Sequence, residues 1–103
     1  MSEDMTKGEF LEKLANPNKE KVLKAMEHFI EQYGTMVAHV TYVSFDRGVH
    51  NILLVTRQTL VETILNKFMI QMNMAIPNAE VRKVVTLEDS DTNHDSHIVQ
   101  INE

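Results

Sequence analysis

One stretch of this 103-residue chain constrains the fold more than any other. Residues 35–56 are rich in Val, Thr, Tyr and Phe and contain a single turn signal. β-Branched and aromatic residues favour extended strands. The signal is Asp46-Arg47-Gly48, in which glycine can take the positive φ of a tight hairpin turn. We therefore expect an antiparallel hairpin with strands over residues 35–46 and 49–56.

The turn leaves the register of this hairpin open. A two-residue turn pairs Phe45 with His50, whereas a turn with a glycine bulge pairs Phe45 with Val49. A slip of one residue exchanges the faces of the second strand relative to the first. The register therefore decides whether His39 and His50, a candidate acid–base or pH-sensing pair, share a face of the sheet.

Apolar stripes with the period of an α-helix predict two longer helices. The first follows Asn16-Pro17, a cap residue and a proline at the first helical position, and ends at Gly34. The second begins at Leu60 within the capping box Thr59-Leu60-Val61-Glu62. The predicted core stripes are Val22, Leu23, Met26, Phe29, Ile30 and Tyr33 in the first helix, and Leu60, Val61, Ile64, Leu65, Phe68 and Met72 in the second.

A short helix at the N-terminus and a second hairpin complete the predicted elements. The capping box Thr6-Lys7-Gly8-Glu9 predicts a helix to about residue 15. Residues 80–88 alternate as a strand does, and a polar turn over residues 89–96 separates them from a final strand over 97–101. The alternation places three apolar side chains on one side of the first of these strands: Val81, Val85 and Leu87.

This order, α-α-β-β-α-β-β, predicts one α+β domain. Two hairpins form a mainly antiparallel sheet, and the helices pack on one face of it. Residues 6–103 make up the domain and residues 1–5 a flexible tail. The chain length is typical of a single domain.

Charge narrows the classes of partner. The net charge is −5, the pI is about 5.5, and no Lys or Arg follows Lys83. An acidic domain disfavours binding to phosphate backbones, and its acidic end could attract a basic protein. Nucleic-acid binding stays as an alternative for two reasons. Three lysines cluster near the start of one predicted helix: Lys19, Lys21 and Lys24. Two aromatic residues of the predicted sheet, Tyr42 and Phe45, could offer surfaces on which bases stack.

The composition also bears on compartment and cofactors. The chain has no cysteine, which excludes disulfides and thiolate zinc sites. Its first residues are polar and acidic, unlike a signal peptide, and no apolar run is long enough to span a bilayer. We expect a cytoplasmic protein with no membrane contact. No cofactor is expected, because the chain has no glycine-rich nucleotide loop.

The polar segment Asp89–His97 is the sharpest candidate for chemistry. It opens like a calcium loop, but His94 stands where the sharp turn needs glycine and Gln100 where a bidentate glutamate belongs. Imidazoles and carboxylates also suit zinc or another transition metal. The candidate ligands are Asp91, His94, Asp95 and His97. The competing interpretation is a solvated turn.

Catalysis has little other support, and no catalytic residue is assigned. No serine lies in a nucleophile elbow, and Asp95-Ser96-His97 is no triad, because triad members converge from separate segments. The alternatives to a binding function are therefore a small metal-dependent or acid–base enzyme that uses residues 89–97, and a nucleic-acid-binding domain.

A surplus of apolar residues favours protein binding. Both faces of the first hairpin carry apolar side chains, although a half-exposed antiparallel sheet should alternate cleanly. Two further apolar residues lie off the stripe of their helix. The candidate partner-binding residues are Val43, Phe45, Ile52, Leu54, Ile70 and Met74. If the short helix over residues 6–15 covers the second sheet face, all of these are core. We otherwise expect an acidic regulatory or inhibitory module that forms a homodimer.

Overall fold

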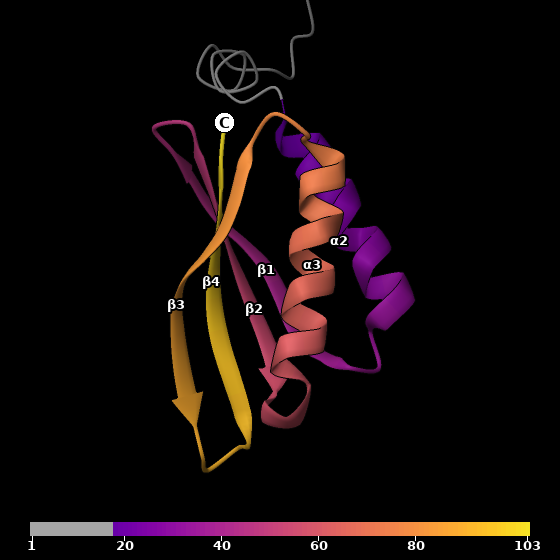
Figure 1. The fold of residues 1–103 in the computed structure, drawn as a ribbon, viewed down its shortest axis with the longest axis vertical. Helices are drawn as coiled ribbons and strands as arrows, with labels where there is room; N and C mark the ends of the chain where they lie inside the picture. The colour runs from indigo at the N-terminus through magenta and orange to yellow at the C-terminus, as the bar shows by residue number, and fades with distance from the viewer. Residues whose placement is uncertain (1–17) are drawn as a thin grey trace, which may run out of the picture.

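The computed structural model describes residues 18–103. Over them the chain forms α2 (Lys19–Tyr33), β1 (Val37–Asp46), β2 (Val49–Arg57), the 3₁₀ turn η1 (Gln58–Leu60), α3 (Val61–Ala75), β3 (Glu80–Asp89) and β4 (His94–Asn102). The strands make one antiparallel sheet in the order β1-β2-β4-β3, and both helices lie on the same side of it (Figure 1). The predicted α+β class and element order are confirmed. The predicted helix over residues 6–15 and the tail over residues 1–5 lie outside the described residues.

The core lies between the two helices and one face of the sheet. Phe29 of α2 and Phe68 of α3 meet edge to face with ring centroids 5.1 Å apart, a favoured geometry for aromatic pairs. Every second residue of the two central strands faces this core, which is what the two-residue period of a strand requires. The fully buried apolar residues are Val22, Phe29, Ile52, Leu54, Ile64, Phe68, Met72, Val99 and Ile101.

The first hairpin takes the two-residue turn. Phe45 pairs with His50 and Asp46 with Val49, and both turn residues have positive φ, 53° at Arg47 and 80° at Gly48. Two successive positive φ values match a type I′ turn, whose twist fits the flanking strands. The turn thereby settles which face each residue of β2 takes.

Helix starts and ends differ from the expected caps. The box at Thr59–Glu62 does not form: α3 begins at Val61, and no side-chain hydrogen bond caps it. Before α3, the amide of Gln58 at the start of η1 donates to the carbonyl of Asn93 at 2.9 Å, which ties η1 to the β3–β4 turn. Gly34 keeps right-handed dihedrals, and a Cβ there would lie 2.5 Å from the Ile30 carbonyl oxygen. This glycine is required by close packing and not by a positive φ.

The second hairpin departs most from the prediction. Its turn spans only residues 90–93, so β4 begins at His94 and contains Asp95 and Ser96. In β3 a bulge between Lys83 and Val85 shifts the register. Val81 therefore packs against the core, while Val85 and Leu87 point to the other face of the sheet. The prediction that these three residues share a face is wrong, because the bulge adds one residue to the alternation.

Candidate functional site

The predicted metal ligands do not converge. Asp91 is exposed in the turn, where its amide donates to the Asp89 carboxylate at 3.0 Å. His94 faces the side of the sheet away from the helices, whereas Asp95 and His97 face the helices, because successive strand residues point to opposite faces. Within residues 18–103 no group of three or more His, Asp or Glu side chains could hold a metal ion. Strand formation separates residues that a turn would have brought together.

His97 is fully buried in a polar pocket of the core. Its Nε2 pairs with the Thr56 hydroxyl and its Nδ1 with the Thr86 hydroxyl, each at 3.1 Å. A hydroxyl can donate or accept, so both ring nitrogens are satisfied whichever one carries the proton. Burial lowers the pKa of His97, Asp95 opposes this effect and Lys83 adds to it. The core therefore favours the neutral ring.

Asp95 lies on the same face, at the corner where β4 passes beneath η1 and the first turn of α3. Its side chain is 93% buried, since its relative exposure is 7%, and Oδ1 has no hydrogen-bond partner among the described residues. A pocket of about 400 Å³ opens beside it, which we call the corner pocket. Its lining residues are Gln58, Thr59, Val61, Glu62, Thr63 and Asp95.

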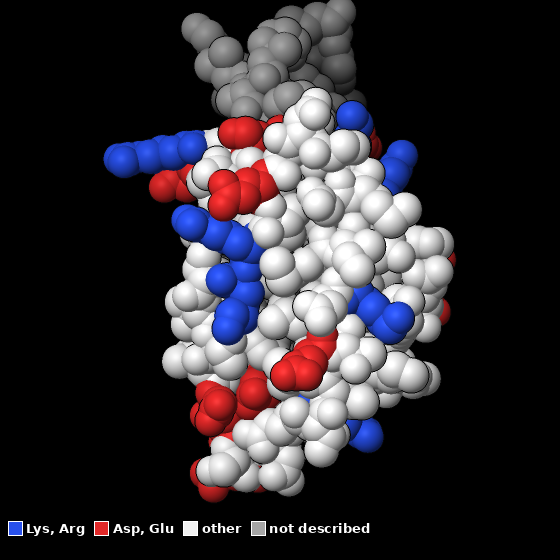
Figure 2. Space-filling view, viewed as in Figure 1, with Lys and Arg blue, Asp and Glu red and all other residues white. Residues whose placement is uncertain are grey.

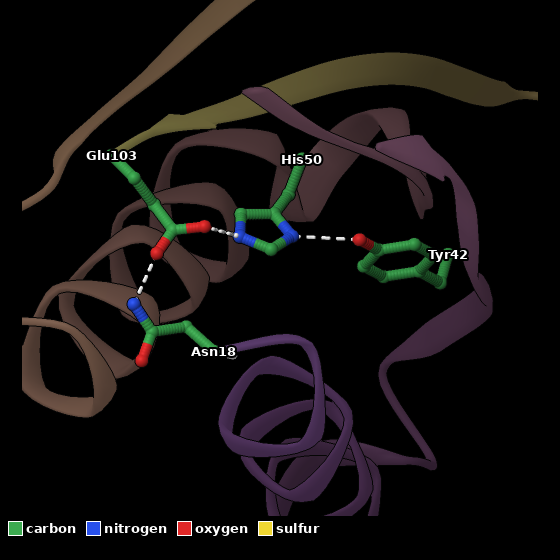
Figure 3. Close-up of polar contacts among 4 residues, drawn as sticks. All are labelled: Asn18, Tyr42, His50 and Glu103. Carbon is green, nitrogen blue, oxygen red and sulfur yellow. Dashed lines mark hydrogen bonds and ion pairs between the residues drawn. The ribbon is translucent and has the colours of Figure 1, made fainter. Parts of the chain in front are cut away.

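A second buried histidine links distant parts of the chain. His50 Nδ1 lies 2.6 Å from the Tyr42 hydroxyl and Nε2 lies 2.5 Å from the Glu103 carboxylate, whose other oxygen accepts from the Asn18 amide (Figure 3). A neutral ring meets both contacts when Nε2–H donates to Glu103 and the tyrosine hydroxyl donates to Nδ1. Hydroxyl, imidazole and carboxylate are the groups of acid–base catalysis. Here the ring is fully buried and both of its nitrogens already have partners, so neither is open to a substrate. The contacts instead link the residue before α2 to β1, to β2 and to the residue after β4.

His39 takes no part in this network. It pairs across the ladder with Val55, on the sheet face opposite His50, and its ring contacts the Thr41 hydroxyl. The two histidines of the first hairpin therefore cannot act together on one ligand. The bulge in β1 at residue 43 lies between His39 and the turn and contributes to this separation, because it reverses the facing of the residues beyond it.

The sheet face away from the helices is the largest candidate surface. Both described helices cover the other face, and the strand register brings five apolar side chains together here: Leu53, Val55, Val85, Leu87 and Ile98. Ile98 pairs with Leu53 on one side and Val85 on the other. Leu87 is 66% exposed and Val85 43%, and the other three are partly exposed. We call this surface the open face.

Polar groups border the open face. The next row of side chains comes from Ser44, Asn51, Gln100 and Arg82. The Gln100 amide donates to Asn51 at 3.0 Å, and the Asn51 amide donates to Ser44 at 3.3 Å. An apolar centre with a hydrogen-bonded rim is the composition of a protein interface.

The predicted partner-binding residues have different fates. Ile52 and Leu54 are fully buried in the core and reach no surface. Phe45 is partly buried and tilts against the His50 ring at 4.6 Å, whereas Val43 is 54% exposed at a bulge. Ile70 and Met74 are 59% and 71% exposed on the outer side of α3. Uncharged surface covers much of this side of the molecule, and acidic side chains lie toward both its upper and its lower end (Figure 2).

Sequence reasoning recognised the apolar surplus of the first hairpin but assigned the exposed positions of β2 to Ile52 and Leu54, which are buried. The run Ile52-Leu53-Leu54-Val55 is apolar on both sides of the strand, and only the register shows which half is buried. The burial of Asp95 also had a signal, because it stands two and four residues before His97 and Val99 on an alternating strand. Because its neighbours in the sequence are polar, the segment was interpreted as a turn and the strand alternation that includes Asp95 was not recognised.

Comparisons with known proteins add no relative. No protein-family model, curated protein or solved structure matches the chain. Among the helices of residues 18–103, none has the length and apolar character needed to cross a membrane.

Proposed function

We propose that this protein is a protein-binding module that associates with a second copy of itself through the open face. The observation that carries the proposal is the cluster of five apolar side chains on the side of the sheet that the described helices leave uncovered. An antiparallel sheet that faces water normally carries polar side chains on that side. Contiguous exposed apolar surface of this kind marks interaction sites.

A second copy suits this surface for two reasons. The centre of the open face carries no charge that would require a complementary partner, and two sheets can pack face to face with their apolar side chains interdigitated. Isologous pairs are the commonest assemblies of soluble proteins. Because each copy carries a net charge of −5, added salt should strengthen the pair by screening repulsion.

The outer side of α3 is the second candidate surface. The segment from Thr63 to Ala79 has one charged residue, Lys67, and exposes Ile70 and Met74. Charge depletion is typical of interface centres. Two large apolar side chains are exposed on each surface, but on the open face three partly exposed ones from neighbouring strands join them, so we rank the outer side of α3 second.

Two matched variants separate the surfaces. Leu87→Glu and Ile70→Glu introduce the same charge at positions of similar exposure, 66% and 59%, so neither change buries a charge in the monomer. We expect light scattering coupled to size exclusion to show a dimer for the wild type and for Ile70→Glu. Leu87→Glu should weaken the dimer by about tenfold or more, because its carboxylate would be desolvated at the contact.

Each other outcome contradicts part of the proposal. A monomer at every concentration in the wild type would exclude self-association. A dimer that Ile70→Glu disrupts and Leu87→Glu preserves would move the interface to α3. A dimer that weakens steeply with salt would indicate contacts between charges and not the apolar face.

A further inference from the structure

The corner pocket combines negative charge with an unmet hydrogen-bonding group. Asp95 and Glu62 both line it, and none of its six lining residues is Lys or Arg. Asp95 Oδ1 is buried and has no partner in the described part of the chain. A buried acceptor without a partner has lost its hydration and gained no hydrogen bond in return, and this free-energy cost is larger for a charged acceptor than for a neutral one. A ligand that supplies hydrogen-bond donors here removes that cost and binds more tightly as a result.

Three further side chains of the pocket carry hydrogen-bond acceptors, and the remaining lining residue, Val61, is apolar. Thr59 and Thr63 carry hydroxyls and Gln58 carries an amide oxygen, so carboxylate, hydroxyl and carbonyl oxygens surround one opening. Oxygen donors of this kind suit either a hard metal ion or an organic cation. The protein supplies too few anionic ligands for the first, since only two carboxylates line the pocket and no described cluster could hold a metal.

Size and geometry select among organic cations. The pocket volume of about 400 Å³ exceeds the space that a bare ion needs and is in the range of small ligand sites. An ammonium group is a compact point charge, whereas a guanidinium presents five N–H donors in a plane and can bind a carboxylate through two of them. Acceptors that are spread over several side chains match the guanidinium.

We propose that the corner pocket binds a guanidinium group, supplied by an arginine side chain of a partner protein. Acidic residues outnumber basic ones near the site: Glu88 is the neighbour of Asp95 across the β3–β4 ladder, and Asp89 and Asp91 follow at the same end of the molecule, where Arg57 also lies. Negative potential at this end would attract a basic partner before the arginine enters. The site lies on the helix side of the sheet, so it is separate from the open face and does not depend on self-association.

The direct test is an NMR titration of the full chain with Nα-acetyl-arginine methylamide, a mimic of an arginine within a protein. We expect saturable shifts of the amides of residues 58–63 and of Asp95, with a dissociation constant in the millimolar range that a single side-chain contact provides. Nα-acetyl-citrulline methylamide has nearly the same shape without the charge. It should bind about tenfold more weakly or worse.

Variants locate the binding. Asp95→Asn should abolish saturation, and Glu62→Gln, a change at an exposed position, should weaken binding several-fold with no effect on the fold. Asp91→Asn removes the same charge from the exposed turn and serves as the matched control, with binding retained. If Asp95→Asn does not fold, Glu62→Gln against Asp91→Asn decides the question. Equal binding in all variants would overturn the proposal.

Further probes distinguish the cation and its source. Free arginine that binds about as well as the blocked form indicates recognition of the side chain alone, and much tighter binding of free arginine indicates a small-molecule ligand of the same chemistry. Calcium or magnesium shifting the same amides at lower concentration than arginine would replace the proposal with a metal site. Linear shifts that are the same for arginine and citrulline would refute it.

Discussion

Acid should destabilise this fold through His97. The ring is fully buried with both nitrogens paired to threonine hydroxyls, and burial holds its pKa below the ordinary value of about 6.5. The unfolded chain therefore binds this proton more tightly than the folded one. The stability that the neutral ring contributes is complete above about pH 6.5 and is lost as pH falls toward the pKa of the folded state.

The size of the effect follows from a single proton. Unfolding takes up at most one proton at His97 between the two pKa values, so the free energy of unfolding falls by at most about 1.4 kcal/mol per pH unit. A domain of this size is stable by roughly 5–15 kcal/mol, so a separation of even one pKa unit is measurable. Asp95 and Lys83 are the charged groups that act on the ring, and their effects have opposite signs.

Urea denaturation at a series of pH values measures this contribution. As the pH falls below about 6.5, we expect the wild type to lose stability more steeply than His97→Gln, whose side chain does not titrate. Titrating groups away from position 97 are common to both proteins and cancel in the difference, whereas the effect of Asp95 on the ring is part of the contribution that is measured. A flat difference curve, or an NMR titration of the His97 ring with a midpoint at or above the ordinary value, would refute the reasoning. The NMR result decides the matter if the variant does not fold.

Two further changes test the core and the hairpin turn. Phe68→Ala removes a fully buried ring that packs on Phe29. Urea denaturation should show a free energy of unfolding lower by about 3–5 kcal/mol. A loss below about 1 kcal/mol would mean that α3 is not packed on α2 and the sheet as described. Gly48→Ala should cost about 1–2 kcal/mol because its φ is 80°, whereas the added Cβ would make only an ordinary contact, 4.0 Å from the Glu103 carbonyl oxygen. Gly48→Asn should recover much of that loss in the same assay, and equal stability of all three proteins would argue against the type I′ turn.

The fold could be predicted because its local signals agree with one another. The apolar stripes of the helices, the Asp46-Arg47-Gly48 turn and the alternation near the C-terminus all point to two hairpins and covering helices. The sequence did not determine the register of the first hairpin, because both possible turns place a glycine at Gly48. Only the backbone angles at Arg47 and Gly48 decide it.

The candidate sites were less predictable because they depend on strand parity and on distant contacts. Bulges at residues 43 and 84 carry no clear sequence mark, and each one reverses the facing of the residues that follow. The contact between His50 and Glu103 joins residues 53 positions apart, which no local pattern encodes. The corner pocket likewise needs β4 to pass beneath η1 and α3, an arrangement that arises only from tertiary packing.

The bulge in β3 couples the composition of the two faces of the sheet. Lys83 and Val85 pair with the adjacent residues Val99 and Ile98, so Val84 is the extra residue of the strand. If Val84 took a regular place in the ladder, Val85 would lie opposite His97, where Thr86 now stands, and Leu87 would turn to the helix side. The one extra residue thus keeps a hydroxyl beside the buried ring and two apolar side chains on the open face. Deletion of Val84 would remove the bulge and preserve both faces, whereas a change that only regularised the strand would exchange the facing of the residues that follow.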